Sequence, residues 1–172
     1  MEKVKIVLDA DVIFHFHKGG KLLFLPEILN EYEHVVLSYV RDEILYDTRV
    51  ALDHQISWLR NLTLVEFAPQ GEMAKEYALL RKQLFGKGES ACMAYCKFTN
   101  NVVGSSNLKD IRAYCAENNI TYLTTCDFLY YAWVRKKMSE EEIQTFVETV
   151  KNHNSKLPDD FDLHTYQPHA ML

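Results

Sequence analysis

The sequence predicts an α/β protein in which a mostly parallel sheet carries helices on both faces. Short β-branched apolar runs of strand length alternate along the chain with segments of helical periodicity. The connections between these segments are short, which favours parallel strands joined by crossover helices. Acidic residues recur where the apolar runs end. In an open α/β sheet the carboxyl ends of the strands are where ligands bind, so the same pattern indicates a site.

Composition narrows the class of protein. The chain has 172 residues, of which 48% are apolar, a size that suits one globular domain. No apolar run is long enough to cross a bilayer, and Leu8 is followed at once by Asp9 and Asp11, which interrupts any export signal. We therefore expect a cytoplasmic protein that does not contact membranes. The four cysteines lack zinc-ribbon spacing and are expected to be buried free thiols.

The first strand is expected at residues 4–8, followed by a helix over 12–17 that ends at Gly19 and Gly20. Further strands are expected at 34–38, 63–67, 101–106 and 121–124. Further helices are expected over 21–32 with a break at Pro26, over 38–50 and 53–61, over 72–84, after Gly86 and Gly88, over 108–118 and 128–138, and after Ser139.

Local signals refine three of these helices. Ser38 is a good N-cap, and a helix beginning there would turn Val40, Ile44, Leu45 and Val50 inward. Either Ser106 or Asn107 caps the helix over 108–118, and Ser139 with Glu142 forms a capping box. We assign residues 1–150 to the folded domain. Residues 151–172 form a polar, aromatic tail that is loosely ordered, part of the same domain, or a strap that docks a partner.

The acidic residues at strand ends, or in the turns that follow them, form one set. They are Asp9, Asp11, Glu43, Glu89, Asp110 and Asp127. Carboxylates that converge repel one another unless a divalent cation joins them, and hard oxygen ligands select Mg²⁺ or Mn²⁺. Such a site orients a water and neutralises the charge of a phosphodiester. Two members have an alternative local role, because Glu43 also suits a helix dipole and Asp127 also suits an N-cap.

Four segments in order resemble the motifs of a PIN domain, the metal-dependent ribonuclease fold of VapC-type toxins. They are residues 6–12 (IVLDADV), 40–44 (VRDEI), 86–91 (GKGESA) and 103–107 (VGSSN), and the resemblance covers roughly residues 4–150. The resemblance implies a three-layer α/β/α sandwich, an acidic cluster that holds Mg²⁺ or Mn²⁺, and single-stranded RNA as substrate. It also implies an antitoxin protein as partner and pairing as a homodimer.

The resemblance assigns roles residue by residue. Asp9 matches the first metal-binding acid, Glu43 the acid of the helix after the second strand, and Glu89 the acid of the Gly-Glu motif. The sequence departs from the family after the fourth strand, where one or two aspartates are common and Ser106 and Asn107 stand instead. Asn107 supplies a neutral oxygen without charge.

Other acids must then complete the site. Asp110 and Asp127 are the candidates to join Asp9 and Glu89 as metal ligands, with Glu43 contributing to catalysis. We expect Asp11, Ser106 and Asn107 to support the ligands, with Asp11 restoring part of the missing charge. An extended chain would let Asp9 and Asp11 share a face, whereas a helix that begins at Ala10 would swing Asp11 away.

The sequence supports three functions from different classes. The first is an endoribonuclease that cleaves single-stranded RNA, as the toxin of a toxin–antitoxin pair. The second is a weakened PIN scaffold that binds RNA or a protein partner, which the Asn107 substitution suggests. The third is a haloacid dehalogenase-like phosphatase, whose opening motif Asp9-Ala10-Asp11 fits, although the acidic pair its last motif needs is present only as Asp159-Asp160, with no strand before it.

Overall fold

The computed structural model describes residues 3–172 and confirms the α/β prediction. Its five parallel strands form one sheet in the order β3-β2-β1-β4-β5. The strands are β1 (Lys5–Leu8), β2 (Glu33–Leu37), β3 (Thr63–Val65), β4 (Val102–Gly104) and β5 (Tyr122–Leu123). Every strand that the sequence predicts is present, although each is shorter than predicted or begins one residue away.

Helices connect the strands as the crossover argument requires. In the first half of the chain they are α1 (Ala10–Lys18), the 3₁₀ turn η1 (Leu22–Phe24), α2 (Leu25–Ile28), α3 (Ser38–Glu43), α4 (Tyr46–His54) and the π-helical turn η2 (Gln55–Leu59). In the second half they are α5 (Gly71–Lys82), α6 (Lys87–Thr99), α7 (Leu108–Glu117), α8 (Thr125–Val134) and α9 (Glu140–Asn152). No helix within residues 3–172 is long and apolar enough to cross a membrane.

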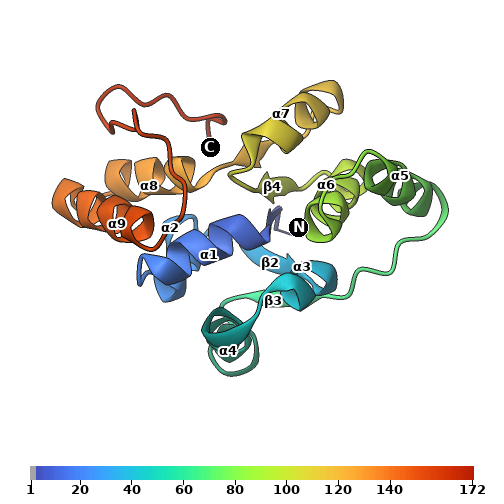
Figure 1. The fold of residues 1–172 in the computed structure, drawn as a ribbon, viewed down its shortest axis with the longest axis horizontal. Helices are drawn as coiled ribbons and strands as arrows, with labels where there is room; N and C mark the ends of the chain where they lie inside the picture. Colours follow the sequence, from blue (N-terminus) through green and yellow to red (C-terminus); the bar gives the residue numbers. More distant parts are fainter. Residues whose placement is uncertain (1–2) are drawn as a thin grey trace.

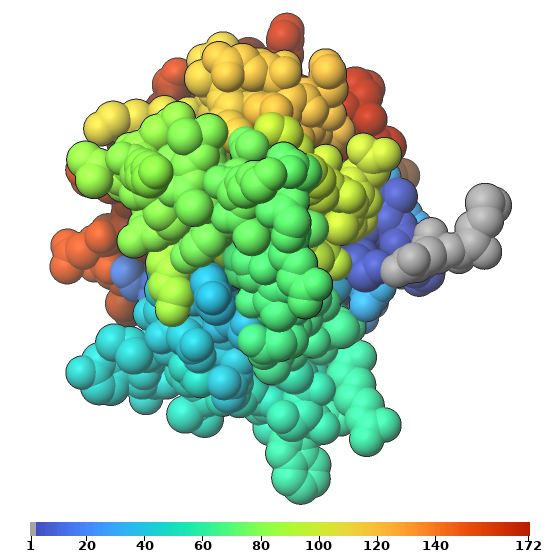
Figure 2. Space-filling view, turned by 90° about the vertical axis from the view of Figure 1, so that its right-hand side faces the viewer, coloured from blue at the N-terminus to red at the C-terminus, as the bar shows by residue number. Residues whose placement is uncertain are grey.

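The helices form layers on either side of the sheet, giving the three-layer α/β/α sandwich (Figure 1). Helix α6 packs along β1, β2 and β4, and α3 and α5 pack against α6. On the other side α1 packs against α8 and α9. Figure 2 looks onto the face that α5 and α6 cover, where their green atoms fill the middle of the view. The four cysteines are free and buried, as predicted.

The region predicted as one helix over 38–50 is two helices, and this prediction was wrong. Ile44 and Leu45 are extended between α3 and α4, and Tyr46 takes a left-handed φ of 54°. The Arg49 guanidinium stabilises the break by donating to the carbonyls of Arg41 and Ile44, which end α3. The break rotates α4, so Leu45 and Val50 are exposed rather than inward.

Three capping or boundary predictions also need correction. The Ser38 hydroxyl does not cap α3; it donates to Glu66 and accepts from the amide of Phe67 after β3. The segment 21–32 is a 3₁₀ turn and a short helix rather than one broken helix, because Pro26 occupies a first-turn position. The last helix before Ser139 begins at Thr125, with Thr124 as its N-cap. The capping box at Ser139 is confirmed.

Residues 153–172 contain no helix or strand, and they fold back over this same chain (Figure 1). Asp127 anchors them. Its carboxylate is fully buried and accepts from the amide and hydroxyl of Thr124, from the Tyr166 hydroxyl and from the amide of His169. The His169 ring also lies against it, with Nδ1 at 2.9 Å. Asp127 is therefore the third residue of a capping box and the attachment point of the tail.

We predict that Asp127→Ala destabilises the protein by roughly 2–4 kcal/mol, because it leaves several buried donors unpaired. Urea unfolding measures the loss. Tryptic cleavage at Lys156 should also accelerate, since the tail loses its anchor. Asp160→Asn, at an exposed tail position, is the matched control and should change neither measurement. Unfolding that is the same for both variants would contradict the anchoring role.

Candidate active site

Five of the six acids lie near the point where the direction of strand order reverses: Asp9, Asp11, Glu43, Glu89 and Asp110. The chain builds β1, β2 and β3 outward in one direction and then crosses back to place β4 on the other side of β1. A crevice forms outside the carboxyl ends of strands at such a switch point. Leu8 pairs with Gly104 in register, so Asp9 and Ser105 leave the sheet at the same level. The amide of Asp9 donates to the Gly104 carbonyl at 2.8 Å.

Asp9 is the N-cap of α1. One carboxylate oxygen, Oδ1, accepts from the amide of Ala10 at 2.8 Å, and the side chain is buried. The other oxygen has no hydrogen-bond partner within residues 3–172. Because α1 begins at Ala10, the side chains of Asp9 and Asp11 leave the backbone in different directions, which decides between the two arrangements that the sequence allowed.

Asp11 binds the loop that follows β4. Its Oδ2 accepts from the amide of Ser106 at 2.7 Å and from the Ser105 hydroxyl at 3.3 Å, and its Oδ1 accepts from the amide of Val12. This carboxylate therefore holds the ends of β1 and β4 together. The supporting role in a metal site that the sequence predicts for Asp11 stays a prediction.

Glu43 and Glu89 approach from the α3 and α6 layer. Glu89 lies in the first turn of α6 and is buried, whereas Glu43 is exposed and accepts from the amide of Gly88 at 2.8 Å. A Cβ at position 88 would lie 2.6 Å from Oε2 of Glu43 and 3.1 Å from Val40. Glycine at this position therefore lets the Glu43 carboxylate reach the start of α6.

Asn107 joins two of the acids. Its side-chain nitrogen donates to Glu89 Oε1 at 2.9 Å and to Asp110 Oδ2 at 2.8 Å. Asn107 is also the N-cap residue of α7, but its side chain makes no capping bond there. The amide thus lies between carboxylates, and rotating it by half a turn would present its oxygen in place of the nitrogen.

Burial raises the pKa values of Asp9, Asp11 and Glu89, and neighbouring acids add to the effect for Asp9 and Glu89. Burial raises the pKa of Asp9 well above its usual range, and the charges of Asp11, Glu89 and Glu43 add to the effect. Burial also raises the pKa of Asp11. The pKa of Glu89 rises to about 7, through burial first and then through Asp110 and Asp11. No ion pair joins these carboxylates to a basic side chain within residues 3–172.

The ligand atoms that this cluster offers are of a chemical type that binds a divalent cation. They are carboxylate oxygens, the ligands that Mg²⁺ and Mn²⁺ prefer. Their positions do not form a complete metal site, because no group of three or more His, Cys, Asp or Glu side chains in the described chain is positioned to hold a metal ion. The carboxylates would have to close around an ion, and Asn107 would have to release the bonds that now link Glu89 to Asp110.

Asp127 is not brought into this cluster, since its carboxylate is taken up by Thr124 and the tail. Ser106 is brought close, and its hydroxyl donates to Oγ1 of Thr125 at 2.9 Å and accepts from the Thr125 amide. The buried His15 ring lies 2.8 Å from the same Thr125 oxygen. Neither Thr125 nor His15 is predicted from the sequence as a site residue, because their contact joins positions that are 110 residues apart.

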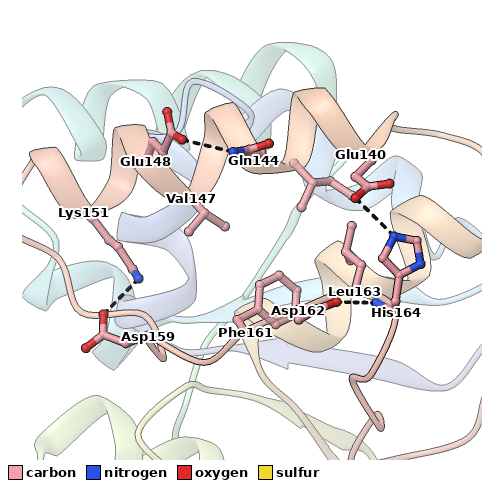
Figure 3. A pocket seen from close by; sticks show the side chains of 11 residues that line it. Glu140, Gln144, Val147, Glu148, Lys151, Asp159, Phe161, Asp162, Leu163 and His164 are labelled. Carbon is pink, nitrogen blue, oxygen red and sulfur yellow. Dashed lines mark hydrogen bonds and ion pairs between the residues drawn. The ribbon is translucent and has the colours of Figure 1, made fainter.

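A cavity of about 450 Å³ lies elsewhere, between α9 and the tail (Figure 3). Val147, Phe161 and Leu163 form its apolar lining, and the Lys151–Asp159 pair and the Glu140–His164 pair lie at its edges. None of the clustered acids lines it. The Asp159-Asp160 pair, which a dehalogenase-like site would require after a strand, belongs to this tail and follows no strand.

No model of a known protein family matches the chain. A search of curated proteins also finds no significant match.

The raised pKa of Glu89 makes stability depend on pH. Between the unfolded value near 4.5 and the folded value of about 7, the folded state binds more protons, so stability falls as pH rises through this window. We predict that the metal-free protein melts at a higher temperature at pH 5 than at pH 8. Glu89→Gln should flatten this slope and raise the pH 8 midpoint by a few degrees, at roughly 2–4 °C per kcal/mol.

Calorimetric melting across pH provides the measurement. Glu141→Gln, at an exposed position on α9, serves as the control and should keep the wild-type slope. If wild type and Glu89→Gln show the same pH dependence, the carboxylate does not titrate in this window.

Proposed function

We propose that this protein is a metal-dependent ribonuclease that hydrolyses phosphodiester bonds in single-stranded RNA. The observation that carries the proposal is the convergence of Asp9, Asp11, Glu89 and Asp110 near the switch point of the sheet. Burial raises the pKa values of Asp9, Asp11 and Glu89, and none of the four carboxylates pairs with a basic side chain within residues 3–172. Charge repulsion of this kind is costly in a purely structural site, and a bound cation would relieve it.

In this proposal Asp9 and Glu89 hold Mg²⁺ or Mn²⁺, and Asp110 joins them when Asn107 turns away. A bound ion of this type neutralises phosphodiester charge and lowers the pKa of a water. A cation binds the deprotonated carboxylate, so the raised pKa of Glu89, about 7 without metal, makes cation binding compete with a proton near neutral pH. Asp11 keeps the two strand ends in place through its bonds to Ser105 and Ser106.

The rim of the site suits a single-stranded chain. The Lys87 ammonium lies 4.3 Å from the ring centre of Tyr39, beside Gly88 and Glu43. A cation can bind a phosphate there, and an aromatic ring can stack with an unpaired base. This pairing of charge and ring beside the acidic cluster supports a single strand over a duplex as substrate.

We predict that the purified protein cleaves a labelled single-stranded RNA in the presence of Mn²⁺, and that a chelator stops the cleavage. Asp9→Asn should lower the rate by about a hundredfold or more, because it removes charge from the centre of the cluster. Gel analysis of the products gives the measurement. Asp160→Asn is the control and should cleave at the wild-type rate. Cleavage that resists chelator, or that Asp9→Asn retains, would exclude this mechanism.

A second function, an inert scaffold that binds RNA or an antitoxin-like protein, is favoured by one contact. Asn107 donates to both Glu89 and Asp110, and so offsets part of their repulsion without a cation. The variant Asn107→Asp distinguishes the two functions. It should raise Mn²⁺ affinity in both cases, measured by calorimetric titration. A scaffold gains cleavage only in this variant, whereas an active enzyme already cleaves with Asn107.

A further inference from the structure

A buried histidine on α1 is connected to the acidic cluster without belonging to it. His15 is 6% exposed, and its ring nitrogen Nδ1 lies 2.8 Å from the hydroxyl oxygen of Thr125. Thr125 is the first residue of α8 and is fully buried. Its hydroxyl oxygen lies 2.9 Å from that of Ser106, in the loop between β4 and α7. We call His15, Thr125 and Ser106 the hydroxyl chain.

Counting hydrogens fixes the direction of each bond in the hydroxyl chain. The Ser106 hydroxyl oxygen accepts from the Thr125 amide at 2.9 Å, and its one hydrogen goes to the Thr125 hydroxyl oxygen. Within residues 3–172 the Thr125 hydroxyl has no acceptor other than Nδ1 of His15, so it donates there. Nδ1 is therefore an acceptor, which requires a neutral ring with its hydrogen on Nε2.

The environment of His15 supports this protonation state. Burial lowers the pKa of His15 to about 4, and the charge of Lys18 adds to the effect, so the ring is neutral at pH 7. A protonated ring carries hydrogen on both nitrogens and cannot accept from Thr125. His15 is thus the terminal acceptor of the hydroxyl chain. A network in which each hydroxyl has both a donor and an acceptor favours one arrangement of its side chains.

Helix α1 holds the loop after β4 at two points. Asp11 and His15 are four residues apart, so they share one face of the helix. Asp11 accepts from the backbone amide of Ser106 at 2.7 Å. His15 holds the Ser106 hydroxyl through Thr125, which lies at the start of α8, a helix that packs against α1 (Figure 1). Ser106 is therefore fixed through its backbone and through its side chain.

The next residue of this loop belongs to the acidic cluster. Asn107 follows Ser106 directly, and its own amide donates to the Ser105 hydroxyl at 3.3 Å. The Asn107 side chain donates to Glu89 at 2.9 Å and to Asp110 at 2.8 Å. A shift of Ser106 therefore moves the Asn107 side chain relative to both carboxylates. A displacement of about 1 Å at a reacting centre can cost on the order of a hundredfold in rate.

We infer that His15 is a positioning residue of the acidic cluster, acting through the hydroxyl chain on the loop that carries Asn107. Within residues 3–172 His15 makes no hydrogen bond to a carboxylate of the cluster, so it acts only by holding Ser106 in place. Its effect on RNA cleavage rests on the proposed ribonuclease function, whereas its effect on the loop does not.

Two pairs of variants test the inference. Thr125→Val removes the hydroxyl at nearly constant shape, whereas Thr125→Ser keeps it. His15→Leu removes the acceptor, whereas His15→Asn supplies an amide oxygen as acceptor in its place. Because two positions are varied, a single variant that fails to fold leaves the other position to decide the test.

Nuclear magnetic resonance of the metal-free protein measures the loop directly. Hydrogen exchange of the Ser106 amide should accelerate about tenfold in Thr125→Val and in His15→Leu, because the loop opens more often. The side-chain amide signals of Asn107, identified by their loss in Asn107→Asp, should shift in the same two variants. Thr125→Ser and His15→Asn should keep the wild-type exchange rate and signals.

Cleavage of single-stranded RNA with Mn²⁺ is the second measurement. Thr125→Val and His15→Leu should lower kcat about tenfold with KM unchanged, because the side chains they alter do not contact the substrate. Thr125→Ser and His15→Asn should stay within about twofold of the wild-type kcat. Thr48→Val, at a buried threonine of α4 outside the hydroxyl chain, is the matched control and should keep both wild-type results.

The two measurements separate this inference from the proposed function. Wild-type loop signals in both Thr125→Val and His15→Leu overturn the inference, whatever the activity. So does equal impairment in Thr125→Ser and Thr125→Val, because side-chain shape rather than the hydroxyl then matters. Wild-type kcat in both variants that break the chain also overturns it. A wild-type protein that cleaves no RNA overturns the proposed function, and the loop signals then decide the inference.

Discussion

The crowding of carboxylates at the ends of β1 and β4 is the constraint on which the surrounding structure depends. Asp9 and Glu89 are both buried there; burial raises the pKa of each, and the charges of neighbouring acids add to the effect. The local backbone is arranged to tolerate this charge: Ala10 donates to Asp9, Ser106 to Asp11, and Gly88 to Glu43. Helices α1 and α6 also begin at this edge, where their positive ends favour negative charge.

Asn107 links the repulsion between the clustered carboxylates to the proposed function. Its side-chain amide donates to Glu89 and Asp110 and so lowers the electrostatic cost of holding the two carboxylates together. A bound cation would have the same effect. An asparagine at this position adds no negative charge to the cluster, as an aspartate would. In the proposed function, competition between this amide and a metal ion for Glu89 distinguishes the enzyme from the scaffold.

Two features lie outside the acidic cluster: the attachment of the C-terminal tail and the orientation of helix α4. Asp127, in the first turn of the helix that follows β5, accepts from Tyr166 and His169 and so anchors the tail rather than joining the cluster. Helix α4 is rotated outward by the break at Ile44 and Leu45. The break leaves Tyr46, Val50 and Trp58 exposed near a cavity of about 380 Å³, where the buried Gln55 amide has no hydrogen-bond partner within residues 3–172.

Sequence patterns alone predicted the α/β class, the five strands, the place of Asp9 at the end of β1 and that of Asp110 in the first turn of the helix after β4, because apolar periodicity and local capping depend on neighbouring residues. The prediction that Glu89 follows a strand was wrong, since Glu89 lies in the first turn of α6, which follows α5. Sequence patterns did not determine the strand order, the bond of Asn107 to Glu89, or the use of Asp127 by the tail. These depend on contacts between residues 18 to 42 positions apart, or on which strands pair. The outward turn of α4 was also decided only in three dimensions, since the Arg49 contacts that end α3 leave no periodic signal.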